Sequence, residues 1–207
     1  MILCEFNEGG DNNMRIPFVP KNVMVQRDRF DFIQQYRGGG FMLIAGSIYW
    51  LLAFALTYVL NETILIKFYI GGGLLVPFLG ILFYKLMKMK ANPSQYSSLV
   101  GFASAITGCC FPVLLLVNEL DSTKILPIIC IINATHLIIL CWIHLEYLYF
   151  IMVMMGVCLG MSFIYSIPSE YVHFICLIWG LISLIFGVII HINSKIPLKG
   201  YDYQIIN

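Results

Sequence analysis

The chain has 207 residues, of which 60% are hydrophobic and only 11% are charged, and its formal net charge is +1. A water-soluble domain of this size could not bury so much apolar surface, which excludes an ordinary soluble enzyme domain. A charge so close to zero also lacks the basic signature of a nucleic-acid-binding protein. The composition therefore predicts a membrane protein whose main partner is the lipid bilayer, with no nucleic-acid partner.

The first 37 residues are predicted to form a cytoplasmic N-terminal segment. Residues 1–24 contain glycine and proline pairs and little apolar periodicity, which predicts a flexible stretch. Residues 26–37 predict a short interfacial helix on the membrane surface, because Phe30 and Ile33 share one side of it. Three glycines at 38–40 predict a flexible elbow before the chain enters the membrane. The start lacks the pattern of a signal peptide, so we expect the first span to direct insertion.

The rest of the chain is dominated by apolar stretches of membrane-crossing length. A helix of about 20 apolar residues crosses the hydrocarbon core. Structures that leave backbone polar groups unpaired are too costly in lipid. Six such stretches occur, at about 41–60, 64–86, 99–117, 125–143, 148–165 and 171–190. The predicted fold is all-α and polytopic, with a six-transmembrane-helix bundle over residues 38–192 and a cytoplasmic tail over residues 193–207.

The basic residues are distributed unevenly between the predicted loops. If all six stretches cross the membrane, ten of the 12 lysines and arginines lie on one side, and only Lys67 and Lys124 lie on the other. Basic residues are retained on the cytoplasmic side of membrane proteins. This bias predicts that both termini are cytoplasmic and that the chain sits in the cell membrane. An even number of spans also places both termini on the same side of the membrane.

Several spans carry residues that change helix packing or helix continuity. Gly156 and Gly160 form a GxxxG pair, which predicts close contact with a neighbouring helix. Pro112 falls in the middle of the third span, where it removes one backbone hydrogen bond. The second span is weakened in the same way by three glycines and Pro77.

A polar cluster is predicted near the middle of the membrane. Asn133 and His136 are three residues apart, so they share a face of the fourth span. Ser104 and Thr107 lie on one side of the third span, at a depth similar to that of His136. We expect these four side chains to form a hydrogen-bonded network. A tight network would be structural, whereas a roomy one would be a binding cavity.

Three functions remain open, because the sequence has no catalytic constellation, no metal site and no cofactor motif. The first is a membrane-embedded sensor, anchor or scaffold subunit that binds a cytoplasmic protein. Its basic residues facing the partner or the lipid would be Arg27, Arg29, Arg37, Lys85, Lys88 and Lys90. The second is a small transporter or channel, assembled as a homo-oligomer, that uses His136. The third is an intramembrane enzyme built on the same histidine.

The pattern of motifs resembles a group of small bacterial multi-pass membrane proteins of unknown function. The resemblance covers roughly residues 24–192 and implies no activity. It rests on Gln26-Arg27-Asp28-Arg29, on Gly46 with Trp50, on Gly71-Gly72-Gly73 with Pro77, and on Ala134 with His136. If the resemblance holds, residues 1–23 would be an extension and Met24 an alternative start.

Overall fold

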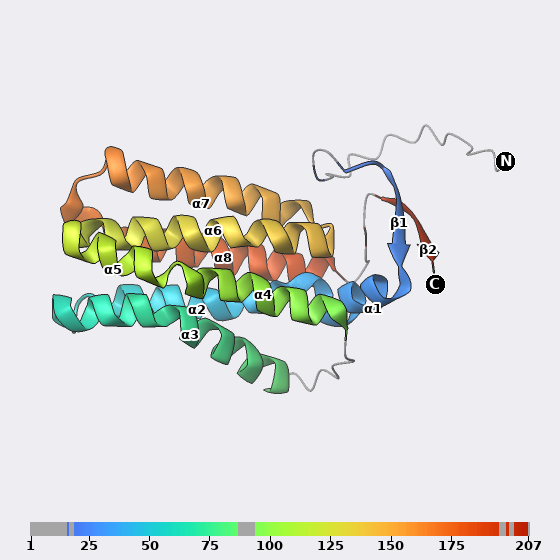
Figure 1. Cartoon of the computed structure of the whole chain (residues 1–207), viewed down its shortest axis with the longest axis horizontal. Helices are drawn as coiled ribbons and strands as arrows, with labels where there is room; N and C mark the ends of the chain where they lie inside the picture. Colours follow the sequence, from blue (N-terminus) through green and yellow to red (C-terminus); the bar gives the residue numbers. More distant parts are fainter. Residues whose placement is uncertain (1–15, 17–18, 87–93, 195–197, 199–200, 207) are drawn as a thin grey trace.

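The computed structural model describes residue 16 and residues 19–86, 94–194, 198 and 201–206. The described part of the chain contains eight α-helices, three short 3-10 helices and two short strands (Figure 1). The α-helices and strands are β1 (Asn22–Gln26), α1 (Arg27–Tyr36), α2 (Gly40–Leu56), α3 (Glu62–Leu86), α4 (Gln95–Cys109), α5 (Phe111–Leu120), α6 (Ile125–His144), α7 (Tyr147–Tyr165), α8 (Phe174–Asn193) and β2 (Asp202–Ile206). The all-α class predicted from hydropathy agrees with this architecture.

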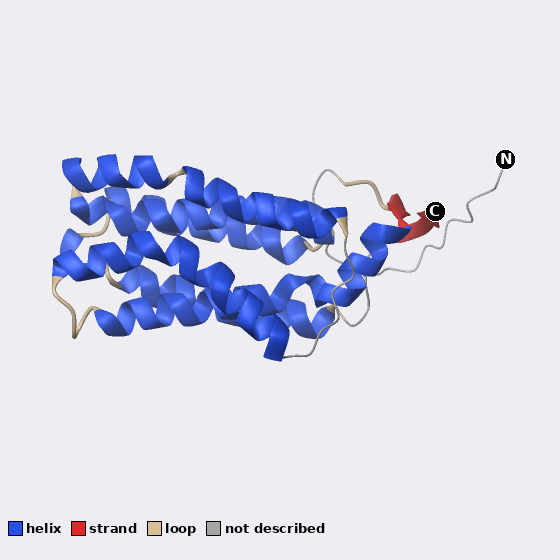
Figure 2. Ribbon diagram, turned by 60° about the horizontal axis from the view of Figure 1, so that its bottom comes forward, coloured by secondary structure: helices blue, strands red, loops and turns tan. Residues whose placement is uncertain are grey.

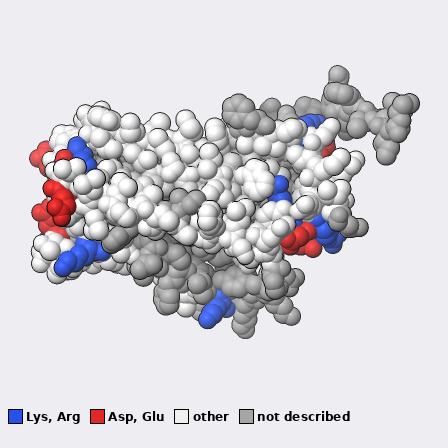
Figure 3. Space-filling view, in the orientation of Figure 1, with Lys and Arg blue, Asp and Glu red and all other residues white. Residues whose placement is uncertain are grey.

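Four stretches of helix in the described residues are long and apolar enough to cross a membrane. They are Arg27–Leu56, Ser122–His144, Tyr147–Tyr165 and Phe174–Asn193. No more than half of each is buried inside the molecule, so large apolar side chains remain on the outside. Charged side chains lie mainly at the two ends of the long axis, apart from a basic group at the lower edge of the view (Figure 3). These features identify a membrane protein.

The third predicted span is made of two helices. α4 ends at Cys109 and α5 begins at Phe111, so the break falls at Cys110. Pro112 has no backbone N–H to donate to the preceding turn, and it occupies the first turn of α5, where that donor is not needed. The break therefore lies where proline interrupts the helical hydrogen bonds of an otherwise continuous apolar stretch.

Glycines bring the main helix pairs into close contact. A Cβ atom added to Gly156 would lie 2.4 Å from the Cβ of Ala134, and one on Gly160 would lie 2.8 Å from the carbonyl oxygen of Pro127. The GxxxG pair of α7 therefore packs against α6, which confirms the predicted contact. α2 and α8 meet in the same way, because Gly40 and Gly187 face each other across that pair.

The two strands join opposite ends of the chain. β1 pairs with β2 in parallel, with Asn22 opposite Asp202 and Gln26 opposite Ile206. Lys21 Nζ lies 3.2 Å from Asp202 Oδ2, and the backbone N–H of Asp202 donates to the carbonyl of Lys21. Figure 2 shows this sheet beyond the end of the bundle. Sequence reasoning predicted flexible chain up to residue 24 and a plain tail after 193, and it missed both strands.

The helix α1 falls within the predicted range 26–37, but its apolar side is covered by protein. Phe32 and Ile33 are 3% and 2% exposed. The Phe32 ring lies 6.0 Å from the ring of Tyr96 on α4 and 5.6 Å from that of His144 on α6. α1 thus docks on the end of the bundle, and its predicted place on the membrane surface stays a prediction.

Candidate functional site

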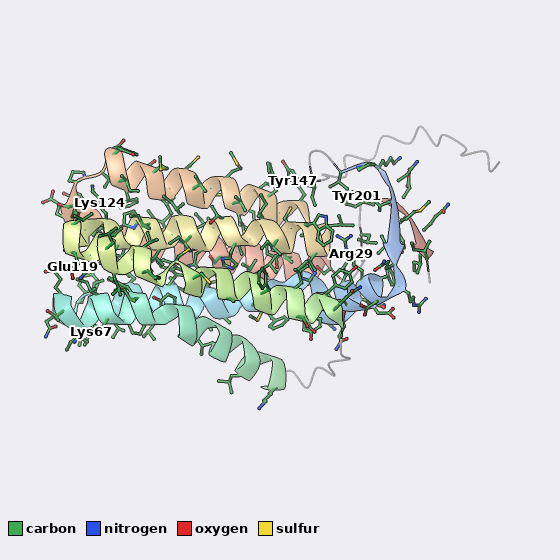
Figure 4. All side chains as sticks on the ribbon, viewed as in Figure 1. Arg29, Lys67, Glu119, Lys124, Tyr147 and Tyr201 are labelled. Atoms are coloured by element: carbon green, nitrogen blue, oxygen red, sulfur yellow. The ribbon has the colours of Figure 1, made fainter. Side chains whose placement is uncertain are left out.

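Both ends of the described chain meet the helix bundle at one end of the molecule. We define the terminal platform as β1, α1 and β2. In Figure 4, Arg29 and Tyr201 are labelled at this end, and Lys67, Glu119 and Lys124 are labelled at the opposite end. The hydroxyl of Tyr201 accepts a hydrogen bond from the backbone N–H of Ile16, at 3.0 Å. The platform therefore ties together segments that are separated by the whole bundle in sequence.

Arg29 fastens the platform to the bundle. Its Nε donates to the carbonyl oxygen of Ile143 at 3.0 Å, and Nη2 donates to the carbonyl of Trp142. The guanidinium carbon also lies 4.5 Å from the centre of the Trp142 ring. These carbonyls belong to the last turn of α6, where free backbone acceptors and the helix dipole favour a cation. Arg29 therefore caps α6 while it holds α1 in place.

The elbow between α1 and α2 is packed tightly. Arg37, Gly38 and Gly39 all have positive φ angles, of 44°, 65° and 75°. The Tyr149 hydroxyl donates to the carbonyl of Gly38 at 2.7 Å in a buried hydrogen bond. A Cβ on Gly39 would lie 2.8 Å from that hydroxyl and 3.0 Å from His144 Nε2. The glycines predicted as a flexible elbow are thus needed for a left-handed turn in close contact with α6 and α7.

The remaining basic residues predicted to face a partner have different surroundings. Arg27 forms an ion pair with Asp31 one turn along α1, at 3.3 Å. Arg37 Nη1 lies 3.4 Å from His191 Nε2. Lys85 is exposed at the end of α3. Lys88 and Lys90 lie outside the described residues. Sequence patterns could not separate Arg29, which is engaged with the bundle, from Arg27, which is exposed on the same helix.

The predicted midplane network is described only in part. The side chains of Ser104 and Thr107 lie outside the described residues. Asn133 donates to the carbonyl of Ile129 in its own helix, at 3.2 Å. His136 is half-buried, and its Nδ1 atom is buried with no hydrogen-bond partner among the described atoms. The Asn133 side chain therefore folds back on α6, its own helix.

Replacing His136 with leucine is expected to leave the stability of the purified protein unchanged or slightly higher. The substitution removes a buried Nδ1 atom that has no hydrogen-bond partner among the described atoms, and replacing such an atom with an apolar group is close to neutral. Tyr149→Phe is the contrasting variant, because it leaves the buried carbonyl of Gly38 unpaired and should cost about 1–3 kcal/mol. Thermal unfolding in detergent measures both. A large loss of stability in His136→Leu would show that the imidazole has a structural partner.

Comparison with known proteins adds a family but no activity. Residues 25–193 match a family of unknown function, DUF7010. The match runs from within β1 to the last residue of α8, so it includes Arg29 and the whole bundle but not β2. Its range is close to that of the resemblance seen in the sequence. No curated protein and no solved structure matches the chain.

Proposed function

Because the chain belongs to DUF7010, a family of unknown function, we propose a role from its own residues: a membrane-embedded anchor or scaffold subunit. It would cross the cell membrane six times, keep both termini in the cytoplasm, and hold a cytoplasmic protein on its terminal platform. The observation that carries this proposal is the platform itself. The two ends of the described part of the chain form a joint surface at one end of an otherwise apolar bundle.

The arrangement of helices supports six crossings. α3 has 25 residues, and α4 and α5 follow each other along the same direction (Figure 1). With α2, α6, α7 and α8 they make six passes along the long axis. β1 and β2 pair, so the two ends of the described chain lie together, as an even number of crossings requires.

The distribution of charge supports the orientation. The platform end carries Lys21, Arg27, Arg29 and Arg37. The opposite end, formed by the links between helices, carries the carboxylates of Glu62, Glu119, Asp121 and Glu170. Basic residues are retained in the cytoplasm, which assigns the platform to that side.

The sheet of the platform supports a protein partner. Two strands alone are marginal in water, and a sheet gains stability by adding a third. Every residue of β2 is exposed, and Ile205 and Ile206 are 38% and 42% exposed. An open strand edge with apolar side chains recognises an extended peptide through backbone hydrogen bonds and alternate side chains. The partner we propose is therefore a protein segment that adds a strand beside β2.

Photo-crosslinking in cells that express the full chain tests this proposal. A benzophenone amino acid in place of Ile206 should capture one defined protein, while the same probe in place of Tyr171, at the opposite end, should not. Ile205→Lys beside the probe places a charge on the strand edge and should abolish the capture without lowering thermal stability. Equal capture from positions 206 and 171, or capture that survives Ile205→Lys, would contradict the proposal.

The transporter and the intramembrane enzyme have less support. Both were predicted to use His136, and its predicted neighbour Asn133 hydrogen-bonds within its own helix instead. The anchor or scaffold role is favoured, because described residues form the contacts that build the terminal platform.

A further inference from the structure

One histidine is buried where the terminal platform meets the bundle. His144 is the last residue of α6 and is only 4% exposed. Its ring stacks with Phe32 of α1, at 5.6 Å between ring centres, and with Tyr149 of α7, at 6.0 Å. Because Phe32 belongs to the platform, release of α1 would expose this imidazole to water.

The imidazole of His144 has no acidic partner in the docked arrangement. Its Nδ1 atom is buried and has no hydrogen-bond partner among the described atoms, and neither ion pair between described residues involves it. Its Nε2 atom would lie 3.0 Å from a Cβ added to Gly39, so the elbow closes over that side. Burying an unpaired charge is far more costly than burying an unpaired polar atom. The docked arrangement therefore suits a neutral ring and not an imidazolium.

Arg29 adds a positive charge close to the same ring. It lies one turn before Phe32 on α1, and its guanidinium donates to the carbonyls of Trp142 and Ile143, the two residues that precede His144. A protonated His144 would be repelled by this guanidinium. The C-terminal end of a helix usually favours a cation, but here Arg29 already occupies those carbonyls.

No carboxylate that the structure describes offsets this repulsion through an ion pair with His144. Glu146 lies in the link after α6, and its carboxylate accepts a hydrogen bond from the backbone N–H of Leu148 at 3.5 Å. The acidic side chains of α1, Asp28 and Asp31, are exposed. A proton on the ring would therefore remain without a negative partner.

The other titratable side chains on the elements packed here include a second histidine. Tyr149 of α7, Tyr96 of α4 and Cys141 of α6 are uncharged near neutral pH. Arg37 of the elbow lies 3.4 Å from His191 of α8. His191 could also respond to pH at this end of the molecule, so an experiment must separate it from His144.

We propose that His144 is a proton-sensitive latch for the terminal platform: protonation of its imidazole releases α1 from the end of the bundle. The open state binds a proton that the docked state excludes. Docking is then strongest above the ordinary histidine pKa of about 6.5, and it weakens as pH falls below that value. The release of α1 is a property of the chain itself, and only its effect on a bound partner rests on the proposed function.

Amide hydrogen exchange over residues 27–36 of the purified full-length protein in detergent tests the latch. Protection factors, which remove the direct effect of pH on exchange chemistry, should fall about tenfold between pH 7.5 and pH 5.5. His144→Phe keeps a stacking ring without a titratable nitrogen, and His144→Gln keeps a polar group without a charge. Each variant should show nearly equal protection at the two pH values.

His191→Gln is the matched control, because it removes the other histidine at this end and should keep the tenfold fall. Protection of α8 should not change with pH, which separates release of α1 from unfolding of the bundle. The proposal is overturned if the parent protein is equally protected at both pH values, if both His144 variants retain the fall, or if His191→Gln abolishes it. Size-exclusion profiles that match the parent protein establish that the variants are folded.

Photo-crosslinking in isolated membranes connects the latch to the proposed partner. Capture from position 206 should decrease at pH 5.5 in the parent chain and persist in His144→Phe. Hydrogen exchange is measured without a partner, so a failure of the latch is detected there. A chain that captures no protein at either pH would instead contradict the anchor role.

Discussion

Replacing Gly40 with alanine is expected to destabilise the whole bundle by about 2 kcal/mol or more, although it adds a single methyl group. A Cβ at this position would lie 2.5 Å from the carbonyl oxygen of Gly187 and 2.6 Å from the backbone nitrogen of His191. Both atoms belong to the backbone of α8, so no side-chain rotation can relieve the overlap. Forcing extra volume into a packed interface typically costs about 1–3 kcal/mol, and more where the neighbours cannot move.

The measurement for Gly40→Ala is thermal unfolding of the purified protein in detergent. A loss of about 2 kcal/mol corresponds to a decrease in Tm of about 4–8 °C for a chain of this size. Gly71→Ala is the matched control, because no described atom lies within 4 Å of the added Cβ. Alanine favours the helix over glycine by about 0.5–1 kcal/mol, so this control should be neutral or stabilising. Equal effects of the two variants would show that α2 and α8 are not in backbone contact.

Replacing Arg29 with glutamine is expected to release α1 from the bundle without unfolding the transmembrane helices. The variant loses charge-assisted hydrogen bonds to the carbonyls of Trp142 and Ile143, and it loses the contact with the indole ring. A hydrogen bond to a charged group contributes about 1.5–3 kcal/mol, and part of this is lost to solvent because the guanidinium is only partly buried. Opening of α1 should therefore become at least about tenfold more frequent.

Amide hydrogen exchange over residues 27–36 measures this release. Arg27→Gln is the matched control on the same helix, because Arg27 is exposed and pairs only with Asp31 among the described residues. An exposed pair of this kind contributes about 0.3–0.5 kcal/mol, so the control should change exchange by less than about threefold. The photo-crosslink from position 206 should also fall in Arg29→Gln and persist in Arg27→Gln. If both variants exchange alike, Arg29 does not hold the platform.

The helical part of the fold could be predicted because its signal is local. The predicted stretch at 125–143 corresponds to α6, Ile125–His144, and the one at 148–165 corresponds to α7, Tyr147–Tyr165. In each case a run of apolar side chains and the cost of exposing backbone in lipid lead to the same helix. The close packing of Gly156 was predictable for a similar reason, since small residues one turn apart let helices approach.

The candidate sites could not be predicted in the same way, because they depend on which distant residues meet. β1 and β2 are five residues each, and neither carries a strong strand pattern; they are defined by pairing between the two ends of the chain. The predicted midplane site centred on His136 because a histidine deep in a span is conspicuous.

The sequence by itself determined that this protein is made of apolar helices suited to a membrane, because that property is a sum over neighbouring residues. Tertiary structure alone decided which arginine caps α6 and which glycine touches the backbone of α8. Residues of the same type occur elsewhere in the chain with similar neighbours in sequence. Their different roles come from contacts across the bundle, whose energies depend on distances of a few ångströms between segments far apart along the chain.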